Sequence, residues 1–341
     1  MDRPCVRVPR EAGERTRQEL ATAGLLDDEY EIVVADGTLY LPVTDPEAVD
    51  ESYDVVRRDV PTHDGQQTPA DLLGFAPSYE RLGDVAILDE DDPDRAREIA
   101  DAILDSDLPV RAVIDRASKV KGDLRVRDWT VVATEDDENQ PVTETVHREY
   151  GFEYLLDLSR VYFSPRLATE RHRVTEQVES GEQVVDMFAG VGPFVVPMAG
   201  RGATVVGVDL NPAAIEYLRE NARRNGVADR VTAIEGDVRD VADDYAGWAD
   251  RVVMNLPHSA DEFLDAAVVL AGSEERRSSG NDCVLHYYDI QHEDDPFGPG
   301  ERAIREAAEP GGFDVDVLTR HVVRSYAPHE LNVCLDVRLS R

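Results

Sequence analysis

Strand-like and helix-like patterns alternate from about residue 168 to the end of the chain. Runs rich in Val predict strands, and the segments between them show the apolar spacing of amphipathic helices. The clearest helix begins at Asn211, which can cap it, has Pro212 in its first turn, and ends at Gly226. Strands are expected at 183–188, 203–210, 231–237, 250–257 and 283–290, followed by a hairpin at 313–327 and 331–340. This order predicts a doubly wound α/β sheet of seven strands.

Two shorter segments precede this region. Residues 1–61 combine a helical pattern with two short strands joined at Asp36-Gly37, and are expected to form a small N-terminal domain. Residues 62–71 are rich in Asp, Pro, Gly and Gln and are expected to be a linker. Residues 72–167 mix three strand patterns with a helix at 93–105 and a solvated acidic loop at 135–140, which predicts a middle α+β domain. The doubly wound domain then occupies 168–341.

The overall composition is that of a globular protein. Hydrophobic residues make up 42% of the 341 positions, enough to bury a large core. The N-terminal stretch is polar and no run of eighteen apolar residues occurs, so we expect a cytoplasmic protein. The three cysteines, Cys5, Cys283 and Cys334, lie far apart, and neither they nor the eight histidines have the spacing of a metal site.

The charge of the chain is extreme, with a formal net value of -35. Such an excess of acid ordinarily argues against an RNA partner, because Lys and Arg provide most of the affinity for phosphates. Lysine, however, occurs only at Lys119 and Lys121, and the acids are spread along the whole chain. This pattern favours adaptation to molar salt, where charges are screened within about 3 Å, so a halophilic source is expected. An acidic protein of an ordinary cytoplasm is the alternative.

Chemistry in a doubly wound sheet is expected just after the strands, at their carboxyl ends. Asp186, Gly190 and Gly192 follow the first strand, where glycines let a ligand approach backbone amides. Val195 occupies the place of the third glycine of a dinucleotide-binding loop, which disfavours a pyrophosphate ligand. Asp209 ends the second strand, where its carboxylate can accept both hydroxyls of a ribose.

A third acid, Asp237, follows the third strand and is placed either to accept from an adenine amino group or to cap a helix. The three acids together resemble the S-adenosylmethionine site of class I methyltransferases, whose Rossmann-like fold matches the expected sheet. We also assign neighbouring residues of these loops to the cofactor site, namely Phe188, Leu210, Val238 and Asn255.

An acceptor site is expected after the fourth strand, at Asn255-Leu256-Pro257-His258. Methyltransferases that modify nucleic-acid amino groups place an Asn or Asp, a Pro and often an aromatic residue here, against an extruded base. His258 stands where the aromatic residue would be, so methylation of adenine N6 is not well supported. A plain turn at the end of a strand is the alternative.

Longer stretches now carry a family resemblance. Five segments resemble the archaeal and eukaryotic tRNA guanine-37 N1-methyltransferase family. They are VYFSPRLATERHRV (161–174), VVDMFAGVGPFVVPMA, VVGVDLNPAAIEYLRENARRNGV, VVMNLPHSADEFLDAA and LHYYDI. The N-terminal stretch VPREAGERTRQELATAGLLDDEYEI is similar to that family's small first domain, which contacts the outer corner of tRNA. The resemblance covers nearly the whole chain and implies methyl transfer to N1 of guanine 37.

Guanine N1 carries a proton, so its methylation needs a base for that proton and a donor for the charge that develops on O6. The family motif implies that Glu170 is the base; an ion pair with Arg171 or Arg173 is the alternative. The family's O6 partner comes from the middle domain, which points to Arg125 and leaves Arg127 open. Asn255 and Pro257 complete the expected catalytic set.

Further residues are expected to contact RNA. Tyr162 can lie near the cofactor or the base, or belong to the core. Both lysines lie within six residues of Arg125, so we expect Lys119 and Lys121 to bind phosphates of the anticodon stem loop. Arg166, Arg171 and Arg173 would extend that basic surface.

Two rival functions are also compatible with parts of this sequence. The aminocarboxypropyl transferase of wyosine biosynthesis shares the fold and the F-A-G-V-G-P-F motif, but the N-L-P motif and Glu170 favour the methyltransferase. A noncatalytic RNA-binding protein of the same fold would not need intact Asp186, Asp209 and Asn255. No metal is expected, and the resemblance implies a monomer.

Overall fold

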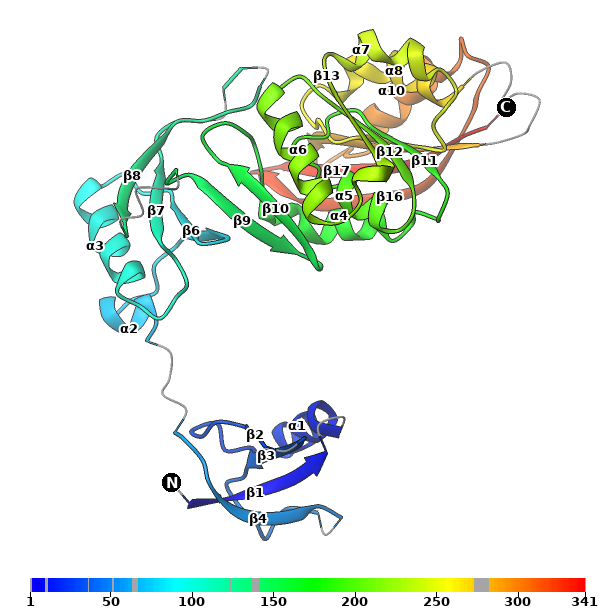
Figure 1. Cartoon of the computed structure of the whole chain (residues 1–341). Helices are drawn as coiled ribbons and strands as arrows, with labels where there is room; N and C mark the ends of the chain where they lie inside the picture. Colours follow the sequence, from blue (N-terminus) through cyan, green and yellow to red (C-terminus); the bar gives the residue numbers. More distant parts are fainter. Residues whose placement is uncertain are drawn as a thin grey trace. The chain divides into compact units, whose positions relative to one another are not determined.

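The structure is a computed structural model, which describes residues 2–9, 12–35, 37–50, 52–62, 67–119, 121–122, 124–135, 141–272 and 282–340. The chain forms two compact units, the first comprising residues 1–74 with 106–108 and the second comprising 75–105 with 109–341 (Figure 1). Asp36, residues 63–66 of the expected linker and residues 136–140 of the expected acidic loop lie outside the described residues. In the described part, no helix is long and apolar enough to cross a membrane.

The first unit is a four-stranded sheet with one main helix. Its strands are β1 (Asp2–Pro9), β2 (Val33–Ala35), β3 (Thr38–Pro42) and β4 (Asp54–Asp59), in the order β2-β3-β1-β4, and its helices are α1 (Gly13–Thr22) and α2 (Pro69–Leu73). Val6, Leu20 and Leu41 are at the centre of its core. The helix and two strands were predicted. β1 and β4 were not, because their short apolar alternation is interrupted by Pro and Arg.

The first part of the second unit is a smaller sheet. It contains β5 (Glu80–Leu82), β6 (Val85–Leu88), β7 (Ala112–Arg116) and β8 (Trp129–Thr134), with α3 (Pro93–Leu104) packed against β7 and β8, and is followed by the hairpin β9 (Glu144–Glu149) and β10 (Phe152–Asp157). Ile114 of this sheet, Tyr154 of the hairpin and Val184 of the following sheet belong to one hydrophobic core. The segments expected as middle and C-terminal domains are thus joined in one compact unit, and their division stays a prediction.

The remainder of the second unit is the predicted seven-stranded sheet, in the order β13-β12-β11-β14-β15-β17-β16. Its strands are β11 (Gln183–Asp186), β12 (Thr204–Asp209), β13 (Val231–Glu235), β14 (Arg251–Met254), β15 (Cys283–His292), β16 (Asp314–Ala327) and β17 (Glu330–Ser340). The first five are parallel and the last two form an antiparallel hairpin. Val185 of β11 pairs with Val206 on one side and Val252 on the other, which aligns the carboxyl ends of the three strands.

Helices cover both faces of this sheet, as a doubly wound fold requires (Figure 1). One face packs against α4 (Ala168–Thr175), α5 (Val195–Gly200) and α6 (Pro212–Arg224), and the other against α7 (Val238–Val241), α8 (Leu264–Ala271) and α10 (Gly298–Ala308). Asn211 caps α6 as predicted, since its side chain accepts a hydrogen bond from the amide of Ala213 at 3.0 Å.

Candidate active site

Asp186 ends β11 in the interior of the protein, where only 1% of its surface is exposed. One carboxylate oxygen accepts a hydrogen bond from the Phe188 amide at 3.1 Å, and the other has no hydrogen-bond partner among the described residues. Burial raises the pKa of Asp186 to about 7, against the lowering effect of the Phe188 amide. A buried carboxylate oxygen without a partner fits a ligand that brings a donor or a positive charge, such as the amino group of S-adenosylmethionine.

The loop after Asp186 has the backbone that its glycines were predicted to allow. Gly190 and Gly192 have φ angles of 52° and 92°, which disfavour other residues. A Cβ at Gly192 would collide with the side chain of Leu218, whereas one at Gly190 would meet nothing within 4 Å. Gly192 is therefore needed for packing against α6, while Gly190 borders open space that a ligand can use.

Asp209, at the end of β12, holds this loop in place. Its carboxylate accepts hydrogen bonds from the Gly190 amide at 2.7 Å and from the Asn211 amide at 2.9 Å. Burial raises the pKa of Asp209, and both amides oppose that effect. Each oxygen retains a free lone pair, so the geometry is compatible with the predicted contact to two ribose hydroxyls.

Asp237 behaves as the helix cap that was the alternative to an adenine contact. Its carboxylate accepts from the amide and the guanidinium of Arg239, and the Arg239 side chain lies over the ring of Phe263. The hydrogen bond from Arg239 lowers the pKa of Asp237. Phe188 packs edge-on against Phe263 at 5.0 Å between ring centroids. Among the other assigned neighbours, the Val238 side chain is buried in the core and Leu210 is exposed.

The Asn255 to His258 turn follows β14, as predicted. The Asn255 side chain makes no hydrogen bond to any residue that the structure describes, and the Pro257 carbonyl accepts from the Ile290 amide at 3.1 Å. A polar cavity of about 220 Å³ lies beside this turn, with Pro257, His258 and Asp289 in its wall. His258 also contacts Tyr326 of β16, with Nε2 3.0 Å from the phenolic oxygen.

Arg125 and Tyr162 lie near Tyr326, the residue that contacts His258 of this turn. Burial lowers the pKa of the Arg125 guanidinium, and the nearby hydroxyls of Tyr162 and Tyr326 oppose that effect. Within the described ranges, Arg125 forms no ion pair. Tyr162 is 45% exposed, which excludes the alternative that it is a core residue. The structure thus groups Arg125, Tyr162, Tyr326 and His258, and sequence reasoning missed Tyr326, which lies on a strand distant in sequence.

Arg127 has a different environment. It lies over the Trp129 ring at 5.4 Å, and its pKa is lowered by burial and by Arg116 and raised by Tyr162, Asp89 and Glu80. Tyr326, which contacts His258 of the acceptor turn, is among the groups that act on Arg125 and is not among those that act on Arg127, so the geometry favours Arg125 as the arginine nearer that turn.

Glu170 is 4% exposed and lies at the start of α4. Its two oxygens accept from Nε and Nη2 of Arg173, each at 2.8 Å, and one also accepts from the Tyr288 hydroxyl at 2.8 Å. His321 of β16 approaches the same carboxylate, with Nε2 at 3.2 Å. The ion pair that was the alternative to a base is therefore present, with Arg173 and not Arg171 as partner.

The expected basic surface is smaller than predicted. Arg171 was wrongly placed on it, because its side chain is 3% exposed and forms a two-pronged ion pair with the buried Glu149. Arg173 is likewise committed to Glu170 and Asp336. Arg166 pairs with Glu80 and Lys121 with Asp128, both at the surface, and Lys119 is exposed.

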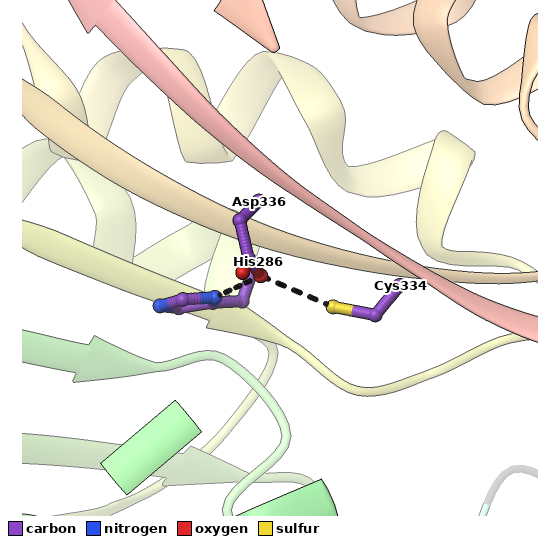
Figure 2. A group of neighbouring side chains, drawn as sticks. All are labelled: His286, Cys334 and Asp336. Atoms are coloured by element: carbon purple, nitrogen blue, oxygen red, sulfur yellow. Dashed lines mark hydrogen bonds and ion pairs between the residues drawn. The ribbon is translucent and has the colours of Figure 1, made fainter. Parts of the chain in front are cut away.

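Three potential metal donors, His286, Cys334 and Asp336, lie together in the core, a cluster that sequence spacing had not revealed (Figure 2). Asp336 accepts from His286 Nδ1 at 2.7 Å and from the Cys334 thiol at 3.5 Å. Arg173 and Arg251 are within 2.7 Å of Asp336 and His286 respectively, and burial raises the pKa of the Cys334 thiol well above its usual value. Two adjacent cations and a protonated thiol make this cluster unsuited to a metal. The period-two spacing of β15 and β17 is the signal that places these side chains on one face.

A seven-stranded sheet in this order, with a glycine loop after its first strand and an acid ending the second, defines a class I methyltransferase, an enzyme that uses S-adenosylmethionine. Residues 145–318 match the TRM5/TYW2 methyltransferase domain, and residues 5–51 match the tRNA methyltransferase 5 N-terminal domain. The chain belongs to the TRM5/TYW2 methyltransferase family, which confirms the resemblance identified from the sequence.

Individual relatives cover most or all of the chain. The tRNA (guanine(37)-N(1))-methyltransferase Trm5b of Pyrococcus abyssi is 40% identical, over 98% of this chain and 98% of its own length. A solved complex of aTrm5 and tRNALeu aligns with a TM-score of 0.68 and 32% identity, over 98% of this chain and 99% of that one. The tRNA(Phe) (4-demethylwyosine(37)-C(7)) aminocarboxypropyltransferase of Pyrococcus horikoshii is 31% identical, over 80% of this chain and 94% of its own length.

Proposed function

We propose that this protein transfers a methyl group from S-adenosylmethionine to N1 of guanine 37 in tRNA. The single observation that carries the proposal is similarity along the whole chain, including the N-terminal unit, to the Pyrococcus abyssi enzyme of that name. The grouping of Arg125 and Tyr162 beside the Asn255 turn supports it, because a guanidinium and an aromatic ring suit an extruded guanine.

In this proposal the cofactor is held by the loops after β11, β12 and β13. Asp186 would hold the amino group, Asp209 would accept from the ribose hydroxyls, and Gly190 would leave room for the ligand. S-adenosylmethionine supplies an activated methyl group when bound. Asp237 is engaged with Arg239, so an adenine contact by this acid requires Arg239 to move.

Glu170 would take the proton of guanine N1 and so free the N1 electron pair to bond to the methyl carbon, while the bond from that carbon to the cofactor sulfur would break and leave its electron pair on sulfur. Its carboxylate is oriented by Arg173 and Tyr288 before substrate arrives, which reduces the reorganisation needed in the transition state. Arg125 donates to O6, where negative charge develops, and has no competing ion pair in the described part of the chain. Asn255 offers an amide without a described partner to the guanine edge, and Pro257 shapes the turn.

Finer features follow from the same proposal. The N-terminal unit binds the outer corner of tRNA, and Lys119 and Lys121 bind phosphates of the anticodon stem loop. We also propose a halophilic source, on the basis of the net charge of -35 and the near absence of lysine. The family resemblance supports a monomer, and the polar N-terminal stretch supports a cytoplasmic location.

A second candidate is transfer of an aminocarboxypropyl group to a wyosine precursor. The family match and the Pyrococcus horikoshii relative favour it as the nearest competitor. That relative, however, covers 80% of this chain, whereas the methyltransferase relative covers 98%. The match of residues 5–51 to a methyltransferase N-terminal domain also favours methyl transfer.

The test is methyl incorporation from labelled S-adenosylmethionine, at molar KCl, into an unmodified tRNA transcript with G37. The same transcript with A37 is the control. We expect N1-methylguanine in the G37 transcript alone. A folded, cofactor-binding protein that methylates neither transcript would overturn the proposal and direct attention to the aminocarboxypropyl group.

A further inference from the structure

Glu170 shares its guanidinium partner with a second buried carboxylate, that of Asp336 on β17. Arg173 donates Nη1 to Asp336 Oδ2 at 2.6 Å and Nη2 to Oδ1 at 3.2 Å, in addition to its two hydrogen bonds to Glu170. Asp336 is 1% exposed. One cation thus bridges two acids that come from opposite ends of the catalytic region.

Asp336 is itself firmly held on its far side. His286 Nδ1 lies 2.7 Å from Oδ1 (Figure 2). On the other oxygen, Gln177 Nε2 lies 3.2 Å from Oδ2. Burial opposes its ionisation, but the hydrogen bonds from His286 and Arg173 hold the pKa of Asp336 far below its ordinary value. Burial also lowers the pKa of His286, which favours a neutral imidazole at neutral pH. Asp336 therefore stays ionised throughout the pH range in which an enzyme works.

The groups that face Glu170 leave one negative charge in excess. They are Arg173 on α4, Tyr288 on β15, His321 on β16, and Cys334 and Asp336 on β17. Burial raises the pKa values of Tyr288 and Cys334 well above their usual values, so both are neutral. The carboxylates of Glu170 and Asp336 then face a single guanidinium, that of Arg173. The remaining neighbour of Glu170 is the partly exposed imidazole of His321.

We propose that Asp336 is a positioning residue for Glu170: it keeps Arg173 paired when Glu170 accepts the proton of the acceptor nitrogen. This inference rests on the function proposed above. Without Asp336, protonation of Glu170 would leave a partly buried guanidinium with no carboxylate, which is costly. With Asp336 present, the bridging cation keeps one full partner in both protonation states, so Glu170 can act as a base despite its ion pair.

The decisive experiment measures single-turnover methyl transfer to the G37 transcript as a function of pH, for the wild type and Asp336→Asn. In the variant, Glu170 is the only carboxylate of the two that still pairs with Arg173, and this stronger pairing stabilises the ionised form of Glu170. The acid limb of the profile is expected to move to lower pH by about one unit, and the plateau rate to fall by up to about tenfold because the base is weaker.

Glu149→Gln is the matched control, because Glu149 also forms a buried two-pronged pair with an arginine of the same helix, Arg171, but has no hydrogen bond or ion pair with Glu170 among the described residues. It is expected to lower the melting temperature as Asp336→Asn does and to leave the acid limb unchanged. If the two variants share one profile, Asp336 has only a structural role and the inference is overturned.

Two further variants keep the result interpretable. If Asp336→Asn does not fold, Gln177→Lys introduces a cation beside Asp336 from an exposed position, and an unmoved acid limb in that variant overturns the inference. Glu170→Gln is expected to lower the rate at least 100-fold. Full activity of Glu170→Gln refutes the base assignment itself, and an inactive wild type refutes the proposed function, so these failures are separate from that of the inference.

Discussion

Arg125 combines two features that are unusual for an arginine at a loop. Its φ angle is 54°, in the left-handed region that non-glycine residues seldom adopt, and its guanidinium is partly desolvated beside Tyr162 and Tyr326. Backbone strain of this kind, of order 1–3 kcal/mol, persists where the surroundings determine the conformation, and it is frequent at functional sites. Both features agree with a cation held ready for a ligand oxygen.

Replacing Arg125 by Ala should therefore remove a donor that acts mainly in the transition state. We expect the single-turnover rate to fall by about 10²–10³, equivalent to about 2.7–4 kcal/mol, with little change in the affinity for S-adenosylmethionine. Arg127→Ala is the matched comparison, since Arg127 lies on Trp129 two residues away. Equal losses in both variants, or a larger loss for Arg127→Ala, would move the O6 role away from Arg125.

At the scale of helices and strands, the parallel sheet was the most predictable part of the chain. β11, β12 and β14 are buried on both faces and read as unbroken apolar runs, so their carboxyl ends, and with them Asp186, Asp209 and Asn255, followed from the sequence. Strand β9 was missed because its polar sequence, ETVHRE, has no apolar pattern typical of a strand. It is a strand because its backbone pairs with β10.

Pairs between distant strands were also out of reach. The sequence allowed an ion pair of Glu170 with either Arg171 or Arg173. In the structure Arg171 pairs with Glu149 of β9, and Arg173 lies where it also pairs with Asp336 of β17. Tyr326 likewise meets His258 only because the terminal hairpin folds beside β15. Such contacts are set by sheet order and register, which local patterns do not specify.

The end of β11 provides a prediction about stability. Burial raises the pKa of Asp186 to about 7, whereas an unfolded Asp has a value of about 3.9. Between these values the native state retains a proton that the unfolded state has lost, so stability decreases as pH rises from about 4 to about 7. Asp186→Asn should remove this penalty and stabilise the cofactor-free protein at pH 8 by up to about 4 kcal/mol, with no gain at pH 4.

Urea unfolding of the cofactor-free protein at pH 4, 6 and 8 measures this effect, with the exposed Asp229→Asn as the control. The variant should also bind S-adenosylmethionine more weakly, because it lacks the unpartnered carboxylate oxygen. An equal gain in stability at all three pH values would contradict this prediction, because it would show that ionisation of Asp186 does not lower the free energy of unfolding.

At the scale of the whole molecule, an acidic enzyme must bind an anionic partner. Asp and Glu number 71 against 36 Lys and Arg, so RNA binding needs either screening by salt or local exceptions to the charge pattern. The structure removes Arg171 and Arg173 from the basic residues available to RNA, because both form ion pairs with buried acids. Lys119 is exposed, and Lys121 has only a surface ion pair with Asp128, which water and salt weaken.

Replacing both lysines by Gln should therefore weaken tRNA binding and flatten its dependence on salt. Each phosphate that the variant no longer neutralises reduces the slope of log affinity against log salt by about 1, so a decrease of about 2 is the largest expected. Binding is measured over the range of KCl in which the melting temperature shows a folded protein. Replacing Arg302 and Arg305 by Gln removes the same charge from helix α10, away from this loop in sequence, and should leave the slope nearly unchanged. If the two double variants have the same slope, the effect is one of net charge alone; only a selective decrease for the Lys119 and Lys121 variant assigns the phosphates to this loop.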